Sequence, residues 1–107
     1  MIYHIVSSQE WAKFAAHEEY APPSLEVSGF IHFSSAAQLA AVARRVFSGQ
    51  RDLLIVEVDE SELTAELRYE ATDGDAFPHL YGPLNLDAVV GIRHLPSADA
   101  DPFPIDR

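Results

Sequence analysis

Alternation of apolar and polar residues predicts several β-strands along this chain. The clearest strand spans Asp52 to Asp59, where apolar side chains recur on both alternating faces. A shorter strand from Phe30 to Phe33 is aromatic and β-branched and follows Gly29, as is typical of a buried strand. Weaker signals of the same kind complete the set, at residues 2–6, 66–70 and 86–95.

A helix is predicted directly after the strand that ends at Phe33. Ser35 and Gln38 have the spacing of a capping box, in which two side chains satisfy backbone N–H groups at a helix start. Arg44 and Arg45 lie off the apolar face of this helix and are expected in solvent. The apolar residues that follow have the i, i+3, i+4, i+7, i+8 spacing of one buried face, namely Leu39, Val42, Ala43, Val46 and Phe47.

An earlier helix is predicted after the first strand. Ser7 and Glu10 form a second capping box, and the helix that they start is expected to end near Tyr20. Its aromatic residues Trp11 and Phe14 share one face, so we expect both to be in the core.

Prolines divide the rest of the chain. Ala21–Ser24 contains two of them and predicts an ordered turn, from which residues 25–28 lead into the central strand. Phe77–Pro83 is rich in aromatic residues, but its two prolines confine it to a sheet edge or an irregular segment. Residues 96–107 are acidic and rich in proline, which predicts a mobile tail after a single globular domain at residues 1–95.

The order of these elements predicts the fold class. Both helices fall in the first half of the chain, and the second half consists mostly of strands. This order favours an α+β domain in which two helices pack on a bent or split, mainly antiparallel sheet.

Composition and charge exclude several classes of function. A formal net charge of −10 argues against nucleic acid as a partner, because phosphate backbones need clustered Lys and Arg. The chain has no cysteine, which excludes disulfides, thiolate metal ligands and a cysteine nucleophile. No apolar run approaches the roughly 18 residues of a membrane span, and no signal peptide is evident. We therefore expect a cytoplasmic protein with no membrane partner.

Three histidines are the main candidates for a functional site. His4 and His32 each lie within a predicted strand among apolar neighbours, where a polar ring destabilises the fold unless it is hydrogen-bonded. His79 lies in the aromatic segment, where a loop could place it over the other two. Ser34 precedes a helix start, whose backbone N–H groups can hold an anion. These signals predict one shared polar pocket.

Other chemistries are also open to these residues. His4, His32 and His79 could form a three-histidine zinc site, although no short His spacing supports it. Several serines could act as nucleophiles, but the chain has no Gly-x-Ser-x-Gly motif. Glu70 is the one acid beside an aromatic residue near the predicted pocket.

Several motifs together resemble the bacterial family known as domain of unknown function 952, from residue 1 to about residue 95. The most specific of them is the run from Phe77 to Leu84, Phe-Pro-His-Leu-Tyr-Gly-Pro-Leu. The others are Tyr3-His4-Ile5, Trp11, Tyr20-Ala21-Pro22-Pro23-Ser24-Leu25, Gly29-Phe30-Ile31-His32-Phe33-Ser34, Gln38 and Arg68-Tyr69-Glu70.

The resemblance implies a fold like that of the ADP-ribosyltransferases, which bind nicotinamide adenine dinucleotide (NAD) in a cleft between two small sheets. A polar residue on the first strand of that superfamily contacts the substrate, and His4 has the matching place. An aromatic or serine residue after a second strand enters the same cleft, which corresponds to the run from His32 to Ser34. The transferases that modify proteins also carry a glutamate on a late strand, whereas His79 and Tyr81 stand in the matching segment here.

Two classes of function follow, with a third as a further alternative. The first is a small enzyme that acts on a nucleotide or an ADP-ribose-like substrate, with NAD or ADP-ribose as candidates. The second is a non-catalytic module that binds a small molecule or a nucleotide, and the third is a metal-dependent hydrolase with three histidine ligands. The expected catalytic residues are His4, His32 and His79, and the expected ligand-binding residues are Ser24, Ser34, Glu70 and Tyr81.

Overall fold

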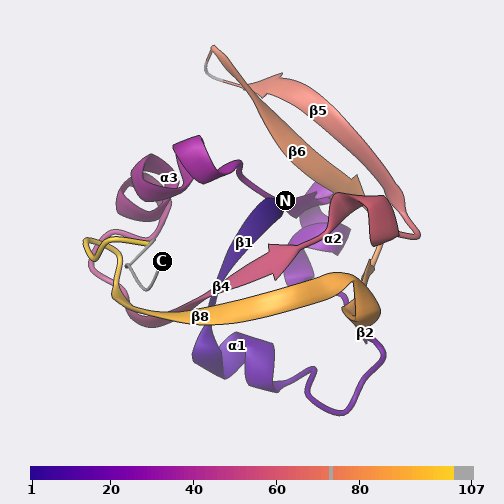
Figure 1. Cartoon of the computed structure of the whole chain (residues 1–107), viewed down its shortest axis with the longest axis horizontal. Helices are drawn as coiled ribbons and strands as arrows, with labels where there is room; N and C mark the ends of the chain where they lie inside the picture. The colour runs from indigo at the N-terminus through magenta and orange to yellow at the C-terminus, as the bar shows by residue number, and fades with distance from the viewer. Residues whose placement is uncertain (73, 103–107) are drawn as a thin grey trace.

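The computed structural model describes residues 1–72 and 74–102, which form two three-stranded antiparallel sheets, one two-stranded sheet and three short helices (Figure 1). Short 3₁₀ turns at Ala36–Gln38, Glu60–Glu62 and Leu86–Ala88 connect some of these elements. The helices and strands follow one another as β1 (Ile2–Ser7), α1 (Ser8–Ala12), β2 (Glu19–Tyr20), α2 (Pro23–Ser28), β3 (Ile31–His32), α3 (Leu39–Val46), β4 (Arg51–Val58), β5 (Glu66–Thr72), β6 (Asp75–Tyr81), β7 (Leu84–Asn85) and β8 (Val89–Ser97).

The first sheet has the strand order β1-β4-β8 and contains much of the core. Both of its pairings are antiparallel, and His4 of β1 lies opposite Val56 of β4. Its buried side chains belong to two separate core clusters, one on each face of the strand, so β4 is covered on both faces, and this explains why its sequence is nearly continuously apolar. Four of its side chains are fully buried, namely Leu53, Ile55, Val56 and Val58.

The second sheet has the strand order β3-β6-β5, and its β5–β6 hairpin projects away from the first sheet (Figure 1). The two sheets meet at one isolated antiparallel bridge, in which Tyr3 and Ser34 exchange both backbone hydrogen bonds, at 2.9 and 2.8 Å. A small β2–β7 pair completes the arrangement. The prediction of an α+β domain with a split, mainly antiparallel sheet is therefore confirmed.

The first helix is much shorter than the capping box suggested. The Ser7 side chain does accept the predicted bond from the Glu10 backbone N–H, but α1 ends at Ala12. The prediction that this helix continues to Tyr20 is wrong, since Tyr20 is a buried strand residue whose ring lies 4.9 Å from that of Trp11. Nine helical residues would place the two rings about 13 Å apart along the axis, so the chain must turn back between them.

Residues 23–28 form the helix α2, where the sequence predicted a turn and an approach to the central strand. Pro23 occupies the first turn of the helix, where a missing N–H costs nothing and the fixed φ favours a helix start. Gly29 ends the helix with a left-handed φ of 86° and donates its N–H to the Leu25 carbonyl. The strand predicted from Phe30 is correspondingly reduced to β3, Ile31–His32.

The capping box of Ser35 and Gln38 forms as predicted. The Ser35 N–H donates to Oε1 of Gln38 at 2.9 Å, and a 3₁₀ turn leads directly into α3. Leu39 and Ala43 of the apolar face are fully buried, and Arg44 and Arg45 are exposed as expected.

Val46 is an exception to the predicted buried face of α3. Its side chain is 56% exposed, so the prediction that it belongs to the core is wrong. Together with Val42 and Phe47 it lines an open cavity instead, because this part of the helix faces a hollow between the two sheets.

The aromatic segment forms β6, the central strand of the second sheet, so its assignment to an edge or an irregular segment is wrong. The Pro78 carbonyl accepts a bond from Phe33 N–H at 3.0 Å, so the missing N–H of Pro78 also faces the β3 side. Because β3 ends at His32, the lost donor falls where the ladder stops.

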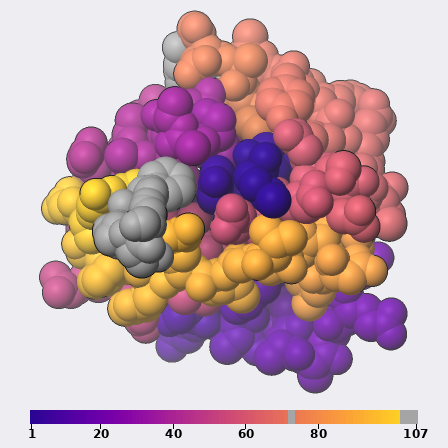
Figure 2. Space-filling view, viewed as in Figure 1, coloured from indigo at the N-terminus to yellow at the C-terminus, as the bar shows by residue number. Residues whose placement is uncertain are grey.

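The last strand, β8, crosses the face of the molecule as an orange band in Figure 2. It continues past residue 95 to Ser97, and Ala98 is buried beside Gln50, whose carbonyl accepts the Ala98 N–H at 3.1 Å. The division between a domain and a tail stays a prediction, and residues 103–107 of that tail lie outside the described residues. Within the described part, no helix is long and apolar enough to cross a membrane.

Candidate functional site

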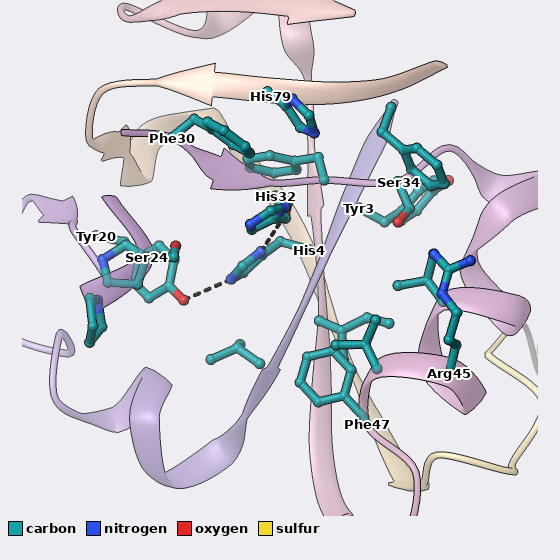
Figure 3. Close-up of a pocket in the computed structure, with 18 residues that line it drawn as sticks. Tyr3, His4, Tyr20, Ser24, Phe30, His32, Ser34, Arg45, Phe47 and His79 are labelled. Atoms are coloured by element: carbon teal, nitrogen blue, oxygen red, sulfur yellow. Dashed lines mark hydrogen bonds between the residues drawn. The ribbon is translucent and has the colours of Figure 1, made fainter. Parts of the chain in front are cut away.

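A cavity of about 550 Å³ lies between the two sheets and α3 (Figure 3). Its walls are largely apolar, with aromatic rings from five different parts of the chain. The structure brings five of the sequence-predicted site residues to this one cavity, namely His4, His32, His79, Ser24 and Ser34.

His4 is buried, and both of its ring nitrogens are engaged within the fold. Nδ1 lies 2.7 Å from the His32 carbonyl, and Nε2 lies 2.7 Å from the Tyr20 hydroxyl. A carbonyl can only accept, so Nδ1 carries the proton and Nε2 accepts from Tyr20. Burial lowers the pKa of His4 to about 4, which keeps the ring neutral near pH 7. His4 therefore joins β1, β2 and β3.

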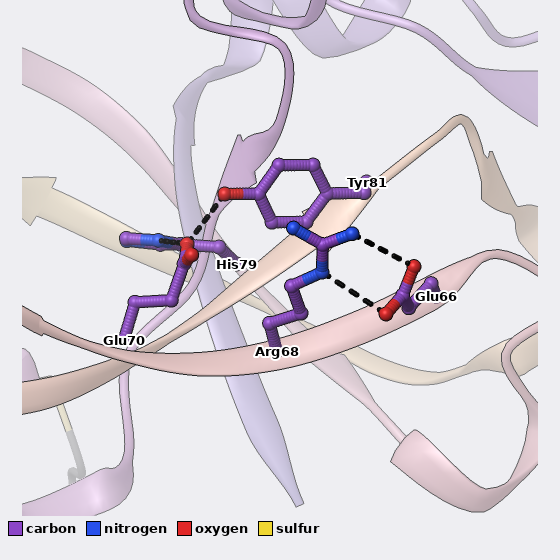
Figure 4. A network of polar contacts seen from close by, with 5 residues as sticks. All are labelled: Glu66, Arg68, Glu70, His79 and Tyr81. Carbon is purple, nitrogen blue, oxygen red and sulfur yellow. Dashed lines mark hydrogen bonds and ion pairs between the residues drawn. The ribbon is translucent and has the colours of Figure 1, made fainter.

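His79 has one nitrogen held by a carboxylate and one facing the cavity. Nδ1 lies 2.6 Å from Oε1 of Glu70, and the Tyr81 hydroxyl donates to the same oxygen at 2.5 Å (Figure 4). These two hydrogen bonds, with Tyr81 the larger cause, lower the pKa of Glu70 and keep it ionised. Nε2 of His79 has no hydrogen-bond partner among the described residues. Since no buried ring nitrogen of those residues lacks a partner, Nε2 is not buried and remains open to the cavity.

Aromatic packing fixes the plane of the His79 ring. Phe30 stacks on it with ring centroids 4.0 Å apart and an interplanar angle of 22°. Behind the cavity wall, the Arg68 guanidinium lies 4.2 Å from the centre of the Tyr81 ring and pairs with Glu66 (Figure 4). Glu70 and Tyr81 therefore act on the cavity through His79 and are not part of its lining.

His32 lies opposite His79 on the neighbouring strand, with ring centroids 5.6 Å apart. Its ring makes edge contacts with Phe30 and His79 but no hydrogen bond with any described residue. Partial burial and the neighbouring His79 lower its pKa, so the neutral ring predominates at pH 7.

Two groups at the cavity were missed by the sequence analysis, namely Arg45 and Tyr20. Arg45 extends from α3 toward Tyr3 and Ser34 (Figure 3), and it is the only Arg or Lys among the described residues that line the cavity. Tyr20 was assigned to a helix end, yet its hydroxyl faces His4. Arg45 follows Val42 by three residues, and this helical spacing is the signal that could have placed it on the cavity side.

The described residues do not form a metal site. No group of three His, Asp or Glu side chains in residues 1–72 and 74–102 is arranged to hold an ion. Nδ1 of His4 donates to a carbonyl and Nε2 accepts from Tyr20, so this ring has no free lone pair for a metal. The three-histidine hydrolase therefore gains no support from this part of the chain.

Comparison with known families identifies the chain. The family model described as "Protein of unknown function (DUF952)" matches residues 5–92, so the chain belongs to this family. This agrees with the resemblance stated from the motifs. No curated protein matched the chain.

The chain is also similar to solved structures of protein CC0527 from Caulobacter crescentus. The crystal structure is 34% identical in sequence, with a TM-score of 0.79 over 87% of this chain and 83% of that chain. The solution NMR structure is 35% identical, with a TM-score of 0.75 over 89% and 84% of the two chains. Both come from structural genomics, and neither name states an activity. These neighbours do not support the implied likeness to the ADP-ribosyltransferases.

Proposed function

We propose that the cavity binds a small molecule of the nucleotide or ADP-ribose class and that His79 exchanges a proton with it. The observation that carries this proposal is the state of His79, which has Nδ1 fixed by an ionised carboxylate and Nε2 open to the cavity. The volume of about 550 Å³ falls within the usual range for small-molecule sites.

The Glu70–His79 pair suits general acid–base catalysis. The carboxylate accepts a hydrogen bond from Nδ1–H, which keeps the proton on Nδ1 and leaves the Nε2 lone pair directed at the ligand. After Nε2 has taken a proton, the imidazolium is stabilised by the negative charge of Glu70 beside it. Stacking on Phe30 limits rotation of the ring, so His79 is already oriented for proton transfer.

The apolar walls favour a ligand with an aromatic ring. Phe30, Phe47 and Phe77 line the cavity and offer faces on which a heteroaromatic base can stack. NAD and ADP-ribose combine such a base with phosphate groups. The proposal therefore includes the ADP-ribosyltransferase-like function that the sequence motifs implied. The acid missing from β6 has a counterpart on the neighbouring strand, where Glu70 contacts both His79 and Tyr81.

A non-catalytic binding module is the second candidate, and the state of His4 favours it. A histidine whose two nitrogens both serve the fold contributes to shape rather than to proton transfer. Under this candidate, ligands bind but no product forms. If the protein is an enzyme, we expect instead that His79→Gln abolishes turnover while the ligand still binds.

The test is NMR titration of the protein with NAD, ADP-ribose and AMP, followed by product analysis of the same mixtures. We expect shifts at Phe30, His32 and Ser34, and a loss of affinity of about tenfold in His32→Ala, equivalent to about 1.4 kcal/mol. His94→Ala is the matched control, because His94 is exposed and pairs with Asp52 away from the cavity. If no nucleotide shifts any cavity resonance, the proposed ligand class is wrong.

A further inference from the structure

Arg45 is a cationic side chain placed on the wall of a cavity that contains no acid. The chain carries 17 Asp and Glu residues, yet none of those described lines this cavity. Arg45 forms no ion pair with any described residue, whereas Lys13 and Arg68 each pair with a nearby glutamate. Its guanidinium donors are therefore available to a ligand.

Ser34 provides a second, independent observation on the same wall. The residue is only 5% exposed, its backbone is fixed by the bridge to Tyr3, and its side chain lines the cavity. The hydroxyl makes no hydrogen bond with any described residue, and since no buried side-chain oxygen among those residues lacks a partner, it is accessible from the cavity. The backbone of Ser34 therefore has a fixed place on the cavity wall, and its hydroxyl has an unused donor.

We propose that Arg45 and Ser34 bind a phosphate group of the ligand in this cavity, an inference that rests on the proposed function. The planar guanidinium presents paired N–H donors that match phosphate oxygens, and the Ser34 hydroxyl adds a donor from a different direction. A tetrahedral phosphate can accept from both directions at once. The site selects phosphorylated ligands over the corresponding nucleosides.

The arrangement also orients the ligand. Arg45 and Ser34 lie on one side of the cavity in Figure 3, and Tyr20 and Ser24 lie on the other, with the histidines between them. A phosphate at Arg45 leaves the rest of the ligand to extend past His32 and His79. Because the protein is strongly acidic, its overall field repels anions, so selectivity depends on these local donors.

The test compares AMP with adenosine, and both with inorganic phosphate, by NMR titration of wild type, Arg45→Gln and Arg44→Gln. The two variants remove the same charge from adjacent exposed residues, but only Arg45 lines the cavity. We expect Arg45→Gln to weaken AMP at least tenfold and leave adenosine unchanged, with Arg44→Gln close to wild type. Inorganic phosphate in the millimolar range should shift the Ser34 resonance in wild type and not in Arg45→Gln. Ser34→Ala should reproduce part of the loss.

The outcomes separate this inference from the proposed function. If AMP and adenosine bind equally and neither depends on Arg45, the phosphate subsite is wrong while the ligand class stands. If no nucleotide binds but phosphate shifts Ser34 in an Arg45-dependent way, the subsite stands and the ligand class is wrong. Equal effects of the two arginine variants, or no response of Ser34 to phosphate, overturn the subsite.

Discussion

The two three-stranded sheets differ in what their central strands bury. The central strand of the first sheet, β4, buries only apolar side chains among its fully covered positions. The central strand of the second sheet, β6, buries His79 between Pro78 and Leu80, and its own Tyr81 shares the Glu70 carboxylate with His79. The first arrangement maximises apolar burial, and the second holds a polar network beside a cavity. Stability and candidate chemistry are thus assigned to different sheets.

The two buried histidines sharpen this difference. His4 belongs to the first sheet and uses both nitrogens to tie together β1, β2 and β3. His79 belongs to the second sheet, uses one nitrogen on Glu70 and keeps the other for the cavity. Burial alone therefore does not distinguish a structural histidine from a functional one. The two kinds of histidine are distinguished by the number of ring nitrogens that are left open to the cavity.

The largest expected effect is in the first sheet. Ile55→Ala removes a fully buried side chain from β4 and leaves a cavity, so it should lower the free energy of unfolding by about 2–5 kcal/mol. Val90→Ala on the exposed face of β8 is the control and should stay within about 0.5 kcal/mol of wild type. Urea denaturation measures both. A small effect at Ile55 would mean that the first sheet is not the stabilising one.

The next effect follows from the buried His4. Its pKa is about 4 in the folded protein and 6.5 when exposed, so the unfolded chain binds more protons between these values. Stability should therefore be full above pH 6.5 and fall as the pH drops toward 4. A shift of this size corresponds to roughly 3 kcal/mol, at about 1.4 kcal/mol for each pKa unit. The lowered pKa of His32 acts in the same direction.

Two measurements assign this pH dependence to His4. Denaturation at several pH values gives the slope, and the slope should persist in His94→Gln, which removes only an exposed ring. NMR titration of the His4 ring protons gives its pKa directly. Titration of that ring near 6.5 would show that it is not enclosed as described.

Much of the fold could be predicted, and the errors have physical causes. The apolar run of β4 located this strand, because a strand that is covered on both faces carries apolar side chains at nearly every position. Ser35 and Gln38 marked the start of the α3 region because a capping box is local chemistry. Pro23 and Pro78 misled the analysis, because a proline breaks structure only where its missing N–H is needed. Pro23 starts a helix, and Pro78 lies where β3 ends.

The site was partly predictable for a related reason. His4 and His32 were singled out because polar rings among apolar residues require partners, and His79 because of its place in the aromatic segment. His4 does have two partners, whereas His32 is exposed and makes no hydrogen bond with a described residue. Arg45 was missed because a helix face that lines a cavity has the same apolar spacing as one that enters a core. The cavity itself arises from the distance between two sheets, and periodicity along the sequence does not encode that distance.

A smaller effect is expected in the polar network of the second sheet. Glu70→Ala removes the acceptor that fixes the Nδ1 proton of His79, so the ring should exchange between its two neutral tautomers. Nitrogen-15 shifts of the ring report this change, and the melting temperature should hardly move because Glu70 is partly exposed. Glu66→Ala on the same strand is the control, since Glu66 pairs with Arg68 and not with His79. An unchanged tautomer in Glu70→Ala would remove Glu70 from the proposed role.

A small effect on stability is also expected at Val46, where the apolar face of α3 meets the cavity. Because this side chain is 56% exposed, a carboxylate introduced by Val46→Asp keeps its water, and the cost should stay below about 1 kcal/mol. A charge of the same kind at a fully buried position of β4 would cost several times more. Next to Arg45, however, the new carboxylate competes with phosphate for the guanidinium, so AMP should bind more weakly than in the neutral control Val46→Thr. Urea denaturation of these two variants tests whether Val46 is a core residue, and AMP titration tests whether the ligand lies next to α3. If Val46→Asp lowers the free energy of unfolding by several kcal/mol, Val46 belongs to the core after all. If its affinity for AMP is unchanged, the ligand lies away from α3.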